Sequence, residues 1–291
     1  MKKRRPVRVY TVPRAGVVTP NLAHNASRLG SSVAFTTLIG EDDFGRMALD
    51  RLDDAGVDTT HAVRHPGIST GVTVLLPHGD RRHILTYSGT IAELKVPALD
   101  FGFLTQARHL HLSSLYFQRG LHDGLANLLA RLKEAGLTLS LDTNDDPADL
   151  WGSPLWEILP LIDVFMPSED ELTRMTRCSG LDAAVQALPV TPPIIAVKRG
   201  KRGARLYDAG VVTEIDPISV VPVDTIGAGD SFDAGFLRAY LLSRDPVICA
   251  RAGNITGALS TQAAGGAEAF RDNVLRDSFL RAHNFFTLIE G

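Results

Sequence analysis

Residues 224–232, DTIGAGDSF, place two glycines and an alanine between two aspartates, just before a segment with helical periodicity. Gly227, Ala228 and Gly229 let the backbone pass close to a ligand, because two of the three residues lack a Cβ atom. The following helix would present unpaired N–H groups and the positive end of its dipole, which suits a phosphate or charge developing on one. Asp230 lies at the mouth of this anion site. Its carboxylate could take a proton from a hydroxyl that attacks phosphorus.

The same stretch has simpler interpretations. An isolated aspartate before a helix is more often an N-cap than a base, and Asp224 could orient a substrate hydroxyl or simply begin the turn. The Gly-x-Gly pair lacks the third glycine of a dinucleotide-binding fingerprint, and the chain has no P-loop motif. The Gly-Asp-Ser sequence begins like the nucleophile elbow of a hydrolase, with Ser231 as the nucleophile. Asp233 stands where that elbow requires a second glycine, which argues against this chemistry.

The 291-residue chain has an ordinary globular composition, with 44% hydrophobic and 22% charged residues. Its length accommodates one large α/β domain or two small ones. A net charge of −3 argues against a nucleic-acid partner, and we interpret the basic run at residues 2–5 as a solvated terminus. No apolar run is long enough to span a bilayer, so we expect no membrane partner. The only cysteines, Cys178 and Cys249, lie far apart, which favours a reducing, cytoplasmic location.

Strand-like and helix-like segments alternate along most of the chain. Periodicity predicts strands at 33–39, 110–115, 137–141, 162–166 and 194–197, and helices at 44–55 and 121–135. Because such alternation is typical of βαβ units, we expect a mostly parallel sheet with both faces covered. From residue 227 onward the pattern is helical, with segments predicted at 231–242, 246–263 and 273–288.

Residues 70–87 break this alternation. Two β-rich runs, 71–76 and 81–87, flank the turn Pro77-His78-Gly79-Asp80, which predicts an antiparallel hairpin. Inside an α/β chain such a hairpin could act as a lid, form a dimer surface, or be an edge hairpin without a role.

Residues 224–237, DTIGAGDSFDAGFL, resemble the C-terminal signature of the PfkB (ribokinase-like) family of carbohydrate kinases. Five other segments resemble features of this family in the same order. They are the N-terminal signature (21–45), the lid hairpin (70–90), the N-x-x-E region (166–172), the nucleotide-side strand and loop (196–207), and the late helix and turn near the adenine (253–267). The resemblance implies a single α/β domain over residues 1–291, with the ribokinase-like three-layer fold. It also implies a small β lid with elements near 7–15 and 70–88.

The resemblance implies an ATP-dependent sugar kinase that transfers the γ-phosphate to a hydroxyl of a small carbohydrate. Its cofactors would be ATP and Mg²⁺, with a monovalent cation as a further expectation. Asp230 would be the catalytic base, and the N–H groups of Gly227, Ala228 and Gly229 would form the anion hole. A homodimer joined through the lids is compatible with the resemblance.

The remaining implied roles divide between substrate and nucleotide. The implied substrate ligands are Asp224, Asn21 and Gly16. The implied nucleotide-side residues are Lys198, Gly200, Gly203, Asn254 and Ser168, and Glu171 would act on Mg²⁺ through water. Asp142 and Asn144 end a predicted strand, where they could reach substrate or phosphates, or form a turn. The motifs indicate a hydroxyl on a small polyol-like molecule, and they leave hexose, pentose, keto-sugar acid and nucleoside open.

The chain departs from the family pattern in three places. Ala15-Gly16 replaces the di-glycine before the asparagine, and Ser168 stands where asparagine is usual. Family chains begin with a buried strand that ends in a sugar-binding aspartate, whereas residues 7–10 resemble the lid strand that follows. We therefore expect either that the true start lies upstream, or that the protein is a catalytically impaired sugar- or nucleotide-binding module. A partner chain could then supply the missing strand.

Overall fold

The computed structural model describes residues 8–11, 21–78 and 81–290. Its central feature is an eight-stranded sheet. Six neighbouring strands run parallel, and two further strands are added at one edge, each paired antiparallel with the strand before it. From that edge the order is β12 (Val211–Ile215), β11 (Ala204–Asp208), β10 (Ile194–Lys198), β9 (Val164–Phe165), β8 (Thr138–Asp142), β7 (His109–Ser113), β1 (Arg8–Thr11) and β2 (Ser32–Phe35). The predicted mostly parallel sheet is confirmed, whereas the antiparallel pair β11–β12 was not predicted.

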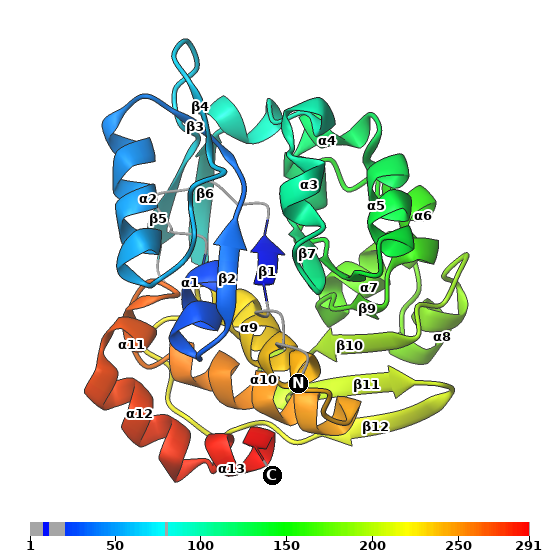
Figure 1. Cartoon of the computed structure of the whole chain (residues 1–291). Coiled ribbons are helices and arrows are strands. Elements are labelled where there is room, and N and C mark those ends of the chain that lie inside the picture. The colour runs from blue at the N-terminus through cyan, green and yellow to red at the C-terminus, as the bar shows by residue number, and fades with distance from the viewer. Residues whose placement is uncertain (1–7, 12–20, 79–80, 291) are drawn as a thin grey trace, which may run out of the picture.

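Both faces of the sheet are covered by helices (Figure 1). Side chains along a strand alternate between the two faces, and on β10 Ile195 and Val197 enter one core while Ala196 enters the other. The first core packs against α3 (Phe101–Leu104), α4 (Arg119–His122), α5 (Leu125–Glu134), α6 (Leu155–Ile158), α7 (Glu169–Thr176) and α8 (Leu181–Gln186). The second packs against α1 (Asn21–Arg28), α2 (Asp43–Asp54), α9 (Ala228–Leu241), α10 (Pro246–Ser260), α11 (Glu268–Arg271), α12 (Asn273–Ala282) and α13 (Phe285–Glu290). The result is the three-layer α/β arrangement expected from the sequence.

Two predicted helices divide where glycine or asparagine interrupts them, and the strand predicted at 33–39 divides into β2 and a separate strand at Leu38–Gly40. The helix predicted at 44–55 is α2, and Asp42 caps it by accepting a hydrogen bond from the Gly45 N–H. The predicted helix at 121–135 divides into α4 and α5 at Gly124, which adopts a left-handed conformation. The segment predicted at 273–288 divides into α12 and α13 at Asn284, which is also left-handed. Short 3₁₀ turns occupy Gly89–Ala92, Val96–Ala98, Leu115–Phe117, Leu159–Leu161 and Gly200–Arg202.

The position of β1 corrects the prediction for the first lid element. Arg8–Thr11 pairs in parallel with β2 on one side and with β7 on the other, so this segment is a central strand of the main sheet. A four-residue extended run does not reveal its own partners, because these lie 24 and about 100 residues further along the chain. The expectation of a missing first strand is therefore wrong. Residues 12–20, which include Gly16, lie outside the described residues.

The hairpin predicted around residues 70–87 is confirmed. β5 (Val72–His78) and β6 (Arg81–Tyr87) pair antiparallel and form a separate two-stranded sheet. A second small sheet, formed by β3 (Leu38–Gly40) and β4 (Val63–His65), lies beside the hairpin (Figure 1). The base of the hairpin is fixed by the N-cap of α2, because Asp42 also accepts a hydrogen bond from the Thr70 N–H at 2.7 Å.

A line of buried polar side chains runs through the sheet on the side that faces α9. The two ring nitrogens of His109 lie 2.8 Å from Thr138 Oγ1 and 2.7 Å from Ser140 Oγ. His111 Nδ1 lies 2.8 Å from the same Ser140 hydroxyl. Burial lowers the pKa of both histidines to about 3, so both rings are neutral at physiological pH. Side-chain hydroxyls of the neighbouring strand β8 therefore hold both rings in place.

We predict that these histidines make stability depend on pH. The pKa of each is about 3 in the folded protein, against 6.5 for a histidine exposed to water, so the unfolded chain binds more protons between these values. Each histidine should therefore cost about 2 kcal/mol of folding stability on acidification from pH 7.5 to 5. His111→Asn should lower stability at pH 7.5 and also flatten its pH dependence. Urea unfolding at both pH values measures this, and identical pH dependence in wild type and variant would show that His111 is not held neutral.

Candidate active site

The loop that leads into α9 has a conformation that only glycine adopts easily. Gly227 has a φ of +70°, and a Cβ atom there would lie 2.7 Å from both Asn21 Nδ2 and Gly266 Cα. The Ala228 N–H is directed at the Thr225 carbonyl, at 3.3 Å. In the part of the chain that the structure describes, the N–H groups of Gly227 and Gly229 have no hydrogen-bond acceptor. The start of α9 therefore has two free donors for an anion.

Asn21 and Asp230 are brought together from opposite ends of the chain. Asn21 is the first residue of α1, and its Nδ2 donates to Asp230 Oδ2 at 3.1 Å. Only 4% of Asn21 is exposed, and its Oδ1 has no partner within the described ranges. A buried acceptor without a donor is costly, so Asn21 Oδ1 is suited to a ligand hydroxyl. Asp230 itself is half-buried, in the first turn of α9.

Ser231 is placed where it cannot act as a nucleophile. Its side chain is fully buried, and its Oγ donates to the Gly227 carbonyl at 2.8 Å. The same oxygen accepts a hydrogen bond from Asn25 Nδ2 at 2.9 Å, and Asn25 also donates to the Gly266 carbonyl. These bonds fasten α1 and the 265–266 turn to the start of α9. The hydrolase interpretation of the Gly-Asp-Ser sequence is therefore not supported.

Asp224 stabilises the loop at residues 224–229 through hydrogen bonds to backbone N–H groups. Its two carboxylate oxygens accept hydrogen bonds from the N–H groups of Ile226 and Gly265, each at 3.0 Å. This joins the 224–229 segment to the turn that follows α10. A direct contact of Asp224 with substrate stays a prediction.

Lys198, at the end of β10, lies beneath the start of α9. A Cβ atom on Gly229 would be 3.5 Å from Lys198 Nζ. The ammonium is 2.7 Å from Asp142 Oδ2, at the end of β8, and 3.3 Å from both carboxylate oxygens of Asp233 in α9. The side chains of both aspartates are at most 3% exposed, and that of Lys198 is 12% exposed. The cluster joins three elements of the fold directly below the free N–H groups.

The pKa values of the ionisable groups in this cluster shift in different directions. Burial alone would lower the pKa of Lys198, but the carboxylates of Asp142, Asp233 and Glu171 raise it above its usual value. Burial alone would raise the pKa of Asp142, whereas attraction to Lys198 lowers it below the usual value. Burial, and repulsion from Asp142, raise the pKa of both Glu171 and Asp233. Lys198 and Asp142 form the ion pair, and the surplus of carboxylates favours a further cation.

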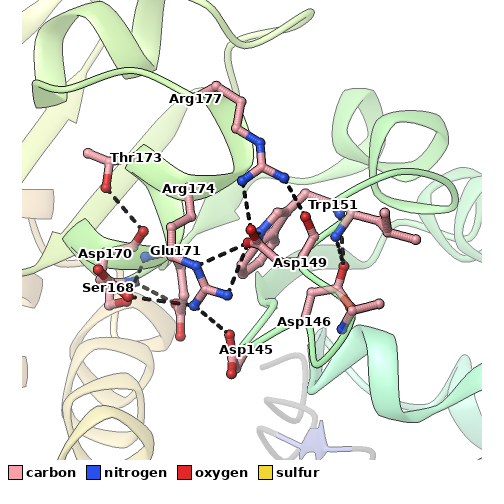
Figure 2. Close-up of polar contacts among 12 residues, drawn as sticks. Asp145, Asp146, Asp149, Trp151, Ser168, Asp170, Glu171, Thr173, Arg174 and Arg177 are labelled. Carbon is pink, nitrogen blue, oxygen red and sulfur yellow. Dashed lines mark hydrogen bonds and ion pairs between the residues drawn. The ribbon is translucent and has the colours of Figure 1, made fainter.

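Ser168 and Glu171 form a capping box at the start of α7, which Figure 2 shows. Glu171 N–H donates to Ser168 Oγ at 3.2 Å, and Ser168 N–H donates to Glu171 Oε2 at 2.8 Å. A serine therefore retains the helix start at a position where asparagine is usual. Glu171 keeps its second oxygen for other contacts.

Two of the other predicted nucleotide-side residues, Gly203 and Asn254, meet at the end of β12. A Cβ atom on Gly203 would lie 2.0 Å from the Ile215 carbonyl oxygen, and Gly203 has a φ of +78°. Asn254 Nδ2 donates to the carbonyls of Ile215 and Asp216, at 3.2 and 2.7 Å. Gly200 has a φ of +56° in the same turn as Gly203. Gly203 and Asn254 therefore hold residues 215–217 from two sides, and their contact with a nucleotide stays a prediction.

A model of the pfkB family of carbohydrate kinases matches residues 14–273. The chain belongs to this family. The match places it among phosphotransferases that act on hydroxyl groups.

Individual relatives of this pfkB-family protein agree with that result. The chain is 29% identical over 248 residues to an uncharacterized sugar kinase of Archaeoglobus fulgidus, covering 85% of this chain and 98% of the relative. It is 28% identical over 224 residues to fructoselysine 6-kinase of Escherichia coli, covering 76% and 79%. Among solved structures, a putative ribokinase II from E. coli, in complex with ATP and Mg²⁺, superposes with a TM-score of 0.84 at 23% identity, covering 95% of this chain and all of that one. The ribokinase-like fold is thereby confirmed.

Among the residues that the structure describes, none of the helices combines the length and the apolar character that a membrane span requires.

Sequence reasoning missed part of this pfkB-family site. Asp142 was left open between a site residue and a turn, and Asp233 was considered only as an obstacle to a hydrolase motif. Asp233 follows Asp230 by three residues, so helical spacing placed it near the same face of α9. Its partner, Lys198, is 35 residues away in the sequence, and no local pattern links the two.

Proposed function

We propose that this protein is an ATP-dependent sugar kinase that transfers the γ-phosphate to a carbohydrate hydroxyl. The observation that carries the proposal is the juxtaposition of Asp230 with the free N–H groups of Gly227 and Gly229 at the start of α9. A carboxylate beside an anion site supplies what phosphoryl transfer needs, which is alignment of the hydroxyl and stabilisation of the phosphoryl charge.

Asp230 is the proposed base. Its carboxylate accepts the proton of the attacking hydroxyl, while Asn21 Nδ2 holds one carboxylate oxygen in place. Asn21 Oδ1, which lacks a partner in the described residues, would accept a hydrogen bond from a substrate hydroxyl. The Gly227 and Gly229 N–H groups would stabilise the negative charge of the transferring group, with Ala228 as the weaker third donor.

The residues below the anion site suit a magnesium-bound nucleotide. Mg²⁺ usually retains several waters and binds one or two carboxylates together with phosphates. Glu171, close enough to Asp142 and Lys198 for their charges to shift its pKa, would hold the ion through water. Bound there, Mg²⁺ would neutralise the phosphate charge.

The nucleotide itself would lie along the turn that contains Gly200 and Gly203. Glycine at both positions permits the positive φ of this turn, and at Gly200 the space beside the backbone is open. Asn254 would lie near the base. A monovalent cation and a cytoplasmic location stay predictions, the latter supported by the two free cysteines.

The alternative, a catalytically impaired binding module, rested on the apparent loss of a central strand. β1 fills that position between β2 and β7, which removes its main support. Between residues 1 and 40 the chain has no aspartate or glutamate. The sugar-binding aspartate at the end of the first strand is therefore absent, and we infer that Asn21 and Asp230 provide hydroxyl contacts instead.

The central test is Asp230→Asn. Removal of the base should lower kcat by ~10²–10⁴-fold, measured as ADP release from Mg·ATP with a panel of hexoses and pentoses. Asp245 is a matched control, because it caps α10 through a hydrogen bond from the Val247 N–H and touches no proposed site residue. Asp245→Asn should retain wild-type activity. Sugar-dependent ADP release that persists in Asp230→Asn within a few-fold of wild type would refute the role of this carboxylate.

We also propose that the hairpin β5–β6 joins two copies of the chain. Val74 and Leu85 are directly opposite each other, and Tyr87 lies on the same face. These three side chains are 46%, 57% and 60% exposed. The other face carries Thr73 and Thr86, whose hydroxyls lie 3.1 Å apart. An apolar face on a two-stranded sheet is poorly stable in water, so a second copy is a natural cover.

Leu85→Glu should therefore convert a dimer into a monomer, because it places a charge within the apolar face. Thr86→Glu, the adjacent residue on the opposite face, should leave the dimer intact. Light scattering coupled to size-exclusion chromatography measures both. A monomeric wild type, or equal disruption by both variants, would contradict the proposed interface.

A further inference from the structure

The segment after β8, residues 143–151, is held against α7 by a network of ion pairs (Figure 2). It begins next to Asp142, the partner of Lys198, and ends at the fully buried Trp151. We call it the β8 loop. It follows Asp142 in the chain, and of its residues only Asn144 was considered above as a possible contact of substrate or phosphates.

The backbone of the β8 loop is in a conformation that needs support. Asn144, Asp149 and Trp151 all have φ between +51° and +53°, which is unfavourable for residues with a Cβ atom. Asp146 stabilises the turn from inside, because its carboxylate accepts hydrogen bonds from the N–H groups of Leu150 and Trp151, each at 2.8 Å. Three such residues within one short loop indicate that surrounding contacts hold it in place.

Arg174 supplies the contacts from α7. Its guanidinium lies 2.8 Å from Asp145 Oδ1 and 3.0 Å from Asp149 Oδ1, and it covers the Trp151 ring at 5.3 Å. Arg177 adds a second contact to Asp149 at 2.8 Å. The hydrogen bonds from Arg177, Trp151 and Arg174 lower the pKa of Asp149 to about 2, so this carboxylate stays charged. Arg174 therefore touches both halves of the loop and the ring at its end.

Arg174 also lies one helical turn beyond Glu171. The two side chains are three residues apart in α7, so the helix couples their positions. The β8 loop, which Arg174 contacts, begins directly after Asp142. Asp142 Oδ1 accepts a hydrogen bond from the Asn144 N–H at 3.2 Å. A displacement of the loop relative to α7 would thus change the spacing between Asp142 and Glu171.

We propose that Arg174 is a positioning residue for Mg·ATP, which sets the spacing of Asp142 and Glu171 by clamping the β8 loop to α7. The proposal rests on the proposed function, since it assumes that these carboxylates lie at a Mg·ATP site. Each ion pair alone is weak, because the side chain of Arg174 is 34% exposed and those of Asp145 and Asp149 are 49% and 43% exposed. The role of Arg174 is therefore geometric, and its loss should affect ligand binding more than folding.

A matched control is present at the far edge of the sheet. Arg205, in β11, also bridges two carboxylates, those of Asp182 and Glu214, each at 3.2 Å. It lies 5.6 Å from the centre of the Tyr207 ring, and its side chain is 23% exposed. Arg205→Gln removes the same kind of contact from β11, which belongs neither to the β8 loop nor to α7.

The experiment compares Arg174→Gln, Arg174→Lys and Arg205→Gln by thermal unfolding over a titration of Mg·ATP, without sugar. For Arg174→Gln, the Mg·ATP concentration that gives half-maximal stabilisation should rise about tenfold, the scale seen when an outer partner of a metal site is lost. Arg174→Lys, which keeps a charge but not the planar fork, should recover part of this loss. Arg205→Gln should lower the melting temperature without ligand and leave the half-maximal concentration unchanged.

Two results would overturn the proposal in distinguishable ways. If Mg·ATP stabilises wild type and Arg174→Gln at the same concentration, Arg174 has no positioning role, and the proposed function stands. If Mg·ATP does not stabilise wild type, both the proposed function and the role of Arg174 fail. Should Arg174→Gln not fold, Arg174→Lys decides, since an unchanged half-maximal concentration there, with Arg205→Gln also unchanged, contradicts the proposal.

Discussion

The buried ammonium of Lys198 is the interaction on which the geometry of the site depends. A charge removed from water must be paired, and here Asp142 and Asp233 pair with it from two different elements. Because β8, β10 and α9 each contribute one member, a shift of any of them would break a buried contact of the Lys198 ammonium. The start of α9, with its free N–H groups and Asp230, is thereby fixed above the carboxyl ends of the parallel strands. Burying these charged side chains costs folding free energy. We therefore interpret the cluster as one that holds the start of α9 in position and not as one that stabilises the fold.

Close packing of small residues completes the alignment of α9. A Cβ atom on Gly235 would lie 2.1 Å from Thr256 Oγ1, and one on Gly253 would lie 2.8 Å from the Phe232 ring. The two helices α9 and α10 can therefore approach closely along their length (Figure 1). At the start of α9, Asn21 fits between Gly227 and Gly266 in the same manner. Glycines in this protein therefore allow helices and loops to pack closely together, in addition to forming turns.

The parts of the fold that could be predicted from the sequence are those set by short stretches of neighbouring residues. The 224–230 loop and the hairpin at 70–87 follow from glycine, proline and aspartate at positions with well-defined backbone preferences. β1 was misplaced because a strand of four residues fits an edge or a centre equally well, and its neighbours are chosen by long-range packing. The Lys198–Asp233 pair was missed for a related reason, since it joins a strand to a helix across the sheet. The sequence at 168–171 has the S-x-x-E pattern of a capping box, whereas the resemblance to the family marked Ser168 only as a missing asparagine.

The most direct measurement of the proposed chemistry is a crystal structure of the protein with a sugar, ADP, Mg²⁺ and aluminium fluoride, which mimics the transferring phosphoryl group. The proposed mechanism predicts fluoride atoms about 3 Å from the backbone nitrogens of Gly227 and Gly229, and a sugar hydroxyl at a similar distance from Asp230. Aluminium fluoride bound away from the start of α9, or a sugar whose hydroxyls all lie beyond hydrogen-bond distance of Asp230, would contradict the proposed mechanism.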